Sequence, residues 1–147
     1  AGEILKQDEL NIKQQHLDSG TDQFDQQGQF SQQINYLPEI DSTALNEYNA
    51  RYLSLFPDNA LAGKKVGVYQ HSGVAREIIP EILEKLGAEV IKLAWSDHFI
   101  PVDTEAVRPE DISLARKWVA EYQLDAIVST DGDADRPLIA DENGDWL

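Results

Sequence analysis

The hydrophobic residues of the chain follow two different periods after residue 41. Apolar positions three or four residues apart predict three helices, at 42–56, 74–86 and 109–122. Short apolar runs predict three strands, at 65–69, 89–93 and 124–130. Asn143-Gly144 lies between two further apolar segments and predicts a hairpin turn that ends in a last strand.

The order of these elements indicates the fold class. Strand, helix and strand within 65–93 form a βαβ unit, which places the two strands parallel in one sheet. Ser72 is expected to cap the helix, Pro80 to kink it and Gly87 to end it. We therefore predict an α/β fold: a small three-layer domain with a mostly parallel sheet flanked by helices, a βαβ unit and a C-terminal hairpin strand.

The first 36 residues have a different composition. Weak periodicity predicts a helix at 6–17, and 18–35 is rich in Gln, Asp, Gly and Ser, which is typical of a linker. We predict that 1–36 is the tail of a preceding domain plus a polar linker, and that 37–147 is the α/β domain. The chain lacks methionine even at position 1, so it is expected to be a fragment of a longer protein.

Charge and cysteine content narrow the possible functions. With 27 acidic and 12 basic residues, the net charge of -15 disfavours nucleic acid and anionic membranes as partners. The absence of cysteine excludes disulfides and thiolate metal sites. The sequence has neither a signal peptide nor an apolar run long enough for a membrane span, and the absence of cysteine suits a cytoplasmic protein.

One acidic segment suggests specific chemistry. Asp131, Asp133 and Asp135 follow the strand 124–130, and ligands of α/β domains bind at this end of a strand. Two carboxylates about 5 Å apart repel by roughly 3 kcal/mol at an effective dielectric of 20, so a cation between them would explain their spacing. Oxygen ligands favour Mg²⁺ or Ca²⁺ over zinc.

Three other interpretations of this segment remain open. It resembles any acidic surface loop, in which Arg136 pairs with a neighbouring aspartate. It also matches positions 1, 3, 5 and 12 of an EF-hand loop through its three aspartates and Glu142, although Arg136 occupies the position of the glycine and the flanks are strands. A haloacid-dehalogenase phosphatase also has aspartates at a strand end, but its further motifs lie downstream.

The residues 131–136, Asp-Gly-Asp-Ala-Asp-Arg, resemble the D-G-D-x-D-R metal loop of the α-D-phosphohexomutases, the phosphomannomutase/phosphoglucomutase family. The segment 64–93 resembles the opening βαβ unit of that family's second domain, and 138–147 resembles the hairpin that leads into the third. Residues 2–17 resemble the tail of the first domain. The resemblance covers most of the chain.

The resemblance implies a four-domain enzyme that interconverts hexose 1-phosphate and 6-phosphate through a phosphoserine and a bisphosphate intermediate. It implies that Asp131, Asp133 and Asp135 bind Mg²⁺, with a phosphoserine oxygen completing the site, and that Arg136 lies near the phosphate. The implied partners are a hexose phosphate and the remaining domains of the same chain.

The chain also departs from the family pattern. The serine loop, the sugar-specificity loop and the phosphate-binding loop have no counterpart, so these 147 residues alone are expected to be inactive. Ser72 follows His71 instead of preceding it, and we interpret this turn as structural. The alternative function is a non-catalytic Ca²⁺-binding or interaction module with an acidic loop.

Overall fold

The computed structural model describes residues 4–16, 24–31 and 38–147. The chain divides into two compact units, residues 1–40 and 41–147. Within the described ranges, no helix has both the length and the apolar character that crossing a bilayer requires. The boundary predicted at residues 36 and 37 stays a prediction.

Among the described residues of the first unit, 4–16 form a helix with its flanks and 24–31 form a tight turn. The helix α1 (Lys6–Lys13) has no buried residue, and it ends four residues before the predicted end at Leu17. The rings of Phe24 and Phe30 stack with their centroids 4.9 Å apart across a turn. The predicted linker at 18–35 falls mostly outside the described residues.

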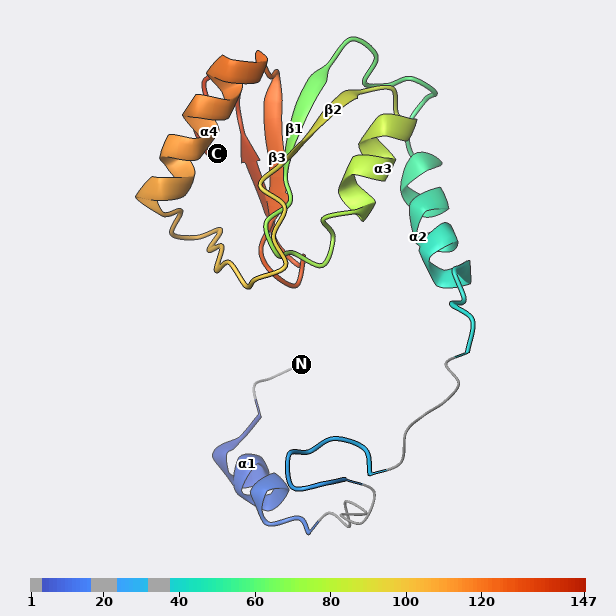
Figure 1. The fold of residues 1–147 in the computed structure, drawn as a ribbon, viewed down its shortest axis with the longest axis vertical. Helices are drawn as coiled ribbons and strands as arrows, with labels where there is room; N and C mark the ends of the chain where they lie inside the picture. The colour runs from blue at the N-terminus through green and yellow to red at the C-terminus, as the bar shows by residue number, and fades with distance from the viewer. Residues whose placement is uncertain (1–3, 17–23, 32–37) are drawn as a thin grey trace. The chain divides into compact units, whose positions relative to one another are not determined.

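The second unit is built on a four-stranded sheet in the order β2-β1-β3-β4 (Figure 1). Its strands are β1 (Lys65–Tyr69), β2 (Glu89–Leu93), β3 (Ala126–Thr130) and β4 (Pro137–Ala140). Strand β1 lies parallel to both β2 and β3, whereas β4 lies antiparallel to β3. The predicted βαβ unit and mostly parallel sheet are therefore confirmed.

Three helices flank this sheet: α2 (Thr43–Leu53), α3 (Ile78–Lys85) and α4 (Pro109–Tyr122). Helix α4 covers one face, while α3 and α2 lie on the other side (Figure 1). Pro109 begins α4 because proline lacks the N–H that a first helical position leaves unpaired anyway. The fold is thus the predicted α/β domain with helices on both faces.

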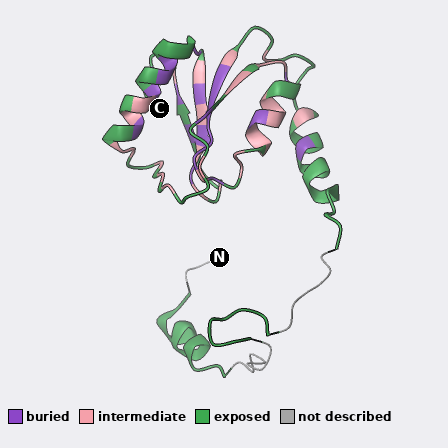
Figure 2. Cartoon of the chain, in the orientation of Figure 1, coloured by how far each residue is buried: buried purple, intermediate pink, exposed green. Residues whose placement is uncertain are grey.

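The buried core lies between α4 and the sheet (Figure 2). Its buried members are Tyr69, Leu93, Ala115, Trp118, Val119, Leu124, Ile127 and Ala140. Trp146 of the C-terminal segment packs against this cluster, and its backbone forms an antiparallel bridge with Ala140. The hairpin predicted from Asn143-Gly144 is present, with the Gly144 N–H donating to the Asp141 carbonyl.

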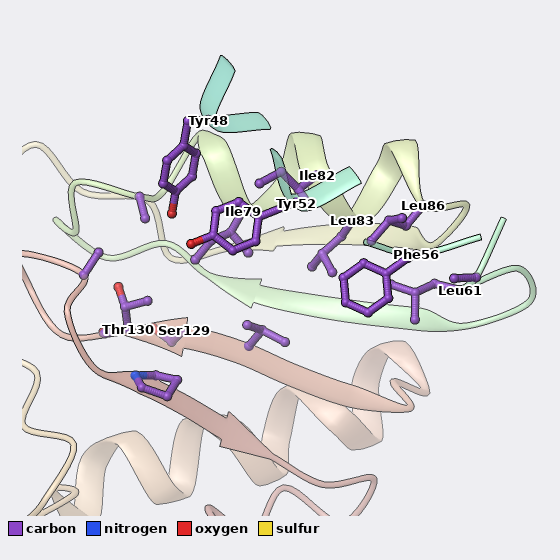
Figure 3. A pocket seen from close by; sticks show the side chains of 15 residues that line it. Tyr48, Tyr52, Phe56, Leu61, Ile79, Ile82, Leu83, Leu86, Ser129 and Thr130 are labelled. Carbon is purple, nitrogen blue, oxygen red and sulfur yellow. Dashed lines mark hydrogen bonds between the residues drawn. The ribbon is translucent and has the colours of Figure 1, made fainter. Parts of the chain in front are cut away.

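The opposite face of the sheet is less completely covered. A pocket of about 410 Å³ opens between α2, α3 and the ends of β3 and β4 (Figure 3). Aliphatic side chains of α3 and the aromatic rings of Tyr48, Tyr52 and Phe56 line most of it. Thr130 and Ala134 form its border with the acidic loop, but the carboxylates of that loop do not line it.

Three details of the predicted 74–86 helix are wrong: its start, its cap and its kink. Helix α3 begins at Ile78, and the hydroxyl of Ser72 is bonded to the backbone of Ile100, so Ser72 caps no helix. Pro80 is then the third residue of the helix, where its missing N–H costs no intrahelical bond and causes no kink. Gly87 follows the helix with φ at 93°, as a glycine at this end should.

Candidate metal site

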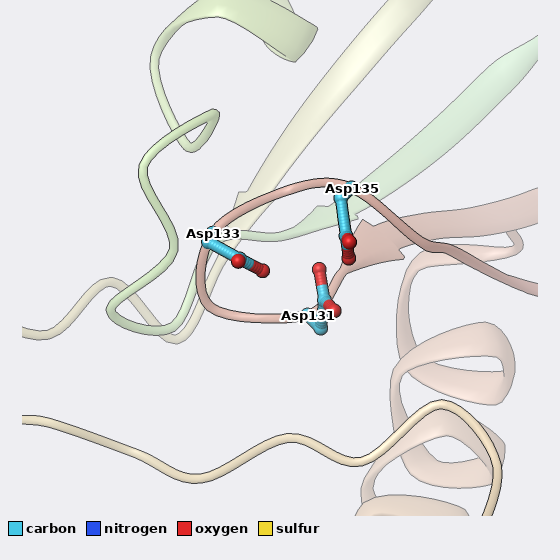
Figure 4. A group of neighbouring side chains, drawn as sticks. All are labelled: Asp131, Asp133 and Asp135. Atoms are coloured by element: carbon cyan, nitrogen blue, oxygen red, sulfur yellow. The ribbon is translucent and has the colours of Figure 1, made fainter. Parts of the chain in front are cut away.

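The three aspartates lie on the loop between β3 and β4. Asp131 follows directly after β3 and is buried, whereas Asp133 and Asp135 are exposed. Each offers one carboxylate oxygen, and these oxygens all lie within 4.8 Å of one another (Figure 4). The sequence prediction that the three carboxylates converge thus agrees with the geometry of the loop.

The donor set fits a hard divalent cation. Two oxygens on opposite sides of a Mg²⁺ ion are about 4.2 Å apart, because each Mg–O bond is about 2.1 Å long. Only one pair among three ligands can lie on opposite sides of the ion, so the carboxylate oxygens, which lie within 4.8 Å of one another, would have to move closer together to bind one ion. Since one of the three side chains is buried and two are exposed, the open side of the loop leaves room for ligands from elsewhere.

Arg136 is tied to the same carboxylates. Its Nε donates to Asp131 Oδ2 at 2.9 Å and to Asp135 Oδ1 at 3.3 Å, and its Nη1 donates to Glu105 Oε1 at 3.2 Å. The backbone N–H of Arg136 also donates to Asp131 Oδ1. Arg136 therefore partly neutralises the negative charge of the acidic loop. This pairing with a neighbouring aspartate is what the interpretation as an acidic surface loop predicts.

The crowding of carboxylates shifts their ionisation. Burial opposes ionisation of Asp131, but hydrogen bonds from Asp135 and from Arg136 outweigh it and hold the pKa of Asp131 below its usual value. The hydrogen bond with Asp131 and the charges of Asp133 and Asp131 raise the pKa of Asp135. Asp135 is therefore protonated more readily than an isolated aspartate, as expected for a carboxylate that lies close to two others.

The turn after β1 is bonded to the acidic loop. His71 Nε2 lies 3.0 Å from the Thr130 carbonyl oxygen, and the Val74 N–H donates to the Gly132 carbonyl at 3.0 Å. His71 is buried, and burial lowers its pKa against the opposing effects of the Thr130 carbonyl and nearby carboxylates, so the ring is neutral near pH 7.

The sequence indicates His71 only as part of a structural turn, and no sequence pattern marks Glu105. Their partners are 59 and 31 residues away in the chain, so no local pattern indicates these contacts. The exposed His98 lies outside the cluster of carboxylates.

The EF-hand interpretation is wrong. Its twelfth residue, Glu142, does not belong to the group of converging carboxylates. The loop is flanked by the strands β3 and β4 instead of by two helices. The structure therefore shows an acidic loop between the strands β3 and β4 in place of an EF-hand.

Comparisons with known proteins agree with this geometry. The profile of the family described as "Phosphoglucomutase/phosphomannomutase, alpha/beta/alpha domain II" matches residues 42–144, which include every strand of the sheet and the acidic loop. The chain belongs to this family. The resemblance noted from the acidic loop and the βαβ unit is thereby confirmed.

The relatives that the chain matches include phosphomannomutases and phosphoglucosamine mutases. A phosphomannomutase of Salmonella muenchen is 46% identical over 146 residues, which are 99% of this chain and 28% of that protein. A phosphomannomutase of Sinorhizobium fredii is 50% identical over 103 residues, 70% of this chain and 22% of that protein. A phosphoglucosamine mutase of Phenylobacterium zucineum is 33% identical over 105 residues, 68% of this chain and 23% of that protein. The chain thus spans about a quarter of the length of these mutases.

Proposed function

We propose that the chain is the metal-binding domain of a phosphohexomutase that interconverts hexose 1-phosphate and hexose 6-phosphate. The observation that carries this proposal is the convergence of Asp131, Asp133 and Asp135 at the carboxyl end of β3, in a chain of this family. The proposed ion is Mg²⁺, which the all-oxygen donor set suits. When bound, Mg²⁺ would offset the negative charge of a phosphoryl group during its transfer.

The residues of this chain contribute position and charge. Asp131 is held by the Arg136 backbone and guanidinium, so its carboxylate is the fixed ligand of the three. Asp133 and Asp135 lie on the exposed side of the loop and would close on the ion from there. The guanidinium of Arg136 is half-exposed, so it can turn from Asp135 to a substrate phosphate once the ion balances the carboxylates.

In the proposed mechanism, the remaining domains of the parent chain supply the phosphoserine and the residues that bind the sugar. The bisphosphate intermediate would form only in that complete protein. The 147 residues alone are therefore expected to bind the ion weakly and to show no turnover. Both mannose and glucose phosphates are candidate substrates. The cytoplasmic location inferred from the sequence stays a prediction.

The test uses the full-length parent protein and phosphorus NMR. Mannose 1-phosphate and glucose 1-phosphate are incubated separately with the enzyme and Mg²⁺, and each 6-phosphate signal is followed over time. We expect conversion of at least one sugar phosphate, loss of conversion when EDTA removes the metal, and recovery when Mg²⁺ is added back. Conversion that continues unchanged in EDTA would overturn the metal role, and no conversion of either sugar would overturn the proposed reaction.

A further inference from the structure

The imidazole of His71 lies directly beside the acidic loop without belonging to it. The side chain is 1% exposed, and its Nε2 lies 3.0 Å from the Thr130 carbonyl oxygen. Because a carbonyl only accepts, Nε2 carries the proton of the neutral ring. The other nitrogen, Nδ1, is buried and has no hydrogen-bond partner among the described residues. Burying an unpaired nitrogen is unfavourable, so packing alone does not explain a histidine here.

The Nε2 bond acts on the peptide that leads into the first aspartate. Because a peptide unit is planar, fixing the Thr130 carbonyl also fixes the N–H of Asp131. That N–H donates to the Arg136 carbonyl at 3.2 Å and closes the acidic loop. On the other side of Asp131, the Gly132 carbonyl accepts from the Val74 N–H at 3.0 Å. The turn after β1 therefore holds the chain both before and after Asp131.

The ring itself is held in one orientation. Tyr69 packs edge-on against it with the ring centroids 5.1 Å apart, and the Tyr69 hydroxyl donates to the buried Asp111. Asp111 in turn accepts from the Arg108 guanidinium at 2.7 Å. A Cβ added to Gly73 would come within 2.9 Å of His71 Cε1, so only glycine leaves the ring its space.

We propose that His71 is a positioning residue of the metal site: its Nε2–H holds the peptide before Asp131 and so sets the direction of the Asp131 carboxylate. The inference rests on the proposed metal role of the loop. Groups that orient a ligand in this way typically change metal affinity by about 10- to 100-fold when they are removed. His71 touches no substrate in this role.

Two amide variants separate positioning from packing. In His71→Gln the side-chain nitrogen is as many bonds from the backbone as Nε2, so it can still donate to Thr130. In His71→Asn the nitrogen is one bond shorter and cannot reach. Both variants are polar and smaller than histidine, so a merely structural role predicts similar losses for both. Gly73→Ala displaces the ring without changing it and provides a third, independent perturbation.

The measurement is NMR of the 147-residue protein, with Mg²⁺ titration and amide hydrogen exchange in separate runs. We expect His71→Asn and Gly73→Ala to weaken Mg²⁺ affinity by about 10-fold or more and to speed exchange of the Val74 amide, while His71→Gln stays within about threefold of the unchanged protein. Thermal unfolding shows whether each variant folds. If either His71→Asn or Gly73→Ala does not fold, the other of these two is compared with His71→Gln.

The outcomes distinguish the two proposals. Saturable Mg²⁺ binding with equal affinity in the Asn and Gln variants, and equal Val74 exchange, would overturn the positioning role alone. Shifts of the Asp133 and Asp135 amides that never saturate in the unchanged protein would overturn the metal role, and with it the inference. A loss confined to His71→Asn and Gly73→Ala supports both.

Discussion

Two acidic loops follow one another in this domain, and their aspartate carboxylates have different surroundings. The first, residues 131–136, and the second, residues 141–145, each contain three acidic side chains. In the second loop, Asp141 accepts from the backbone N–H of Asn143 at 2.9 Å and of Asp145 at 3.0 Å. Its carboxylate therefore closes a turn by itself, without any ion.

The remaining partners continue this contrast. Asp145 accepts from the Arg116 guanidinium at 2.7 Å, and the backbone and side-chain donors around Asp141 lower its pKa. In the first loop the three carboxylates converge, Asp131 and Asp135 share the guanidinium of Arg136, and the pKa of Asp135 is raised. The comparison teaches that composition does not identify a metal loop. The balance of hydrogen-bond donors and acceptors distinguishes the two loops, and it singles out residues 131–136 as the proposed metal loop.

The largest expected effect concerns turnover of the full-length parent. Asp133→Asn removes one ligand from the proposed ion, and the loss of metal-assisted charge stabilisation should lower kcat by about a thousand-fold. Asp145→Asn changes the same residue type in the second loop and should leave kcat within about threefold. Steady-state assays with saturating Mg²⁺ measure both. Similar losses in the two variants would remove the functional distinction between the loops.

The second largest effect is expected on stability, when the glycine of each loop is replaced by alanine. Gly144 has φ at 78°, and a Cβ there would lie 2.6 Å from the backbone N and Cα of Arg116, whereas a Cβ on Gly132 would meet nothing within 4 Å. Gly144→Ala should therefore lower the free energy of unfolding by about 3 kcal/mol, through strain and a clash with α4. Gly132→Ala should change it by less than about 0.5 kcal/mol.

Urea unfolding of the 147-residue protein measures the two glycine variants side by side. A large loss of stability in Gly132→Ala would mean that the first loop is as tightly built as the second. It would then be difficult to regard the open space around Gly132 as room for a ligand.

The sequence predicts the framework of the domain well because its local signals are strong. The apolar runs of β1 and β2, the proline that begins α4 and the glycine that follows α3 all mark their elements. The acidic spacing at 131, 133 and 135 predicts carboxylates that converge, since a short loop at a strand end brings alternate residues together. These are properties of a few neighbouring residues.

What the sequence does not predict depends on contacts between distant segments. The hydroxyl of Ser72 could cap a helix as far as its local sequence is concerned, but the backbone of Ile100 occupies it. The role of His71 is likewise not evident from its local sequence, because its partner Thr130 lies 59 residues away. Local patterns contain no information about which loop will lie beside which, so this part of the site needed the structure.

A smaller effect is expected from Mg²⁺ on the stability of the 147-residue protein. At a free Mg²⁺ concentration about ten times the dissociation constant, binding should add about 1.4 kcal/mol to the free energy of unfolding. Asp133→Asn should abolish this gain, and Asp141→Asn should retain it while lowering the stability measured without metal. Thermal unfolding with MgCl₂, against NaCl of equal ionic strength, separates binding from general screening. A gain that survives in Asp133→Asn would place the ion elsewhere.

The smallest effect is the pH dependence of stability in EDTA, and here the two loops should differ in sign. The pKa of Asp141 is lowered, so its contribution is present above the unfolded-state pKa and is lost as pH falls through the lower folded-state value. The pKa of Asp135 is raised, so its contribution is present at low pH and is lost as pH rises through the higher folded-state value.

Free energies of unfolding measured between about pH 2.5 and 7 therefore test the comparison directly, because the unfolded-state pKa of aspartate is about 3.9. Asp141→Asn should remove part of the loss of stability on the acidic side. Asp135→Asn should do the opposite and relieve a penalty that grows toward neutral pH, when no cation is present to offset the repulsion among the carboxylates. A shift of the same sign in both variants would show that the two loops handle their carboxylates alike, and the donor balance would then fail as a criterion for the metal loop.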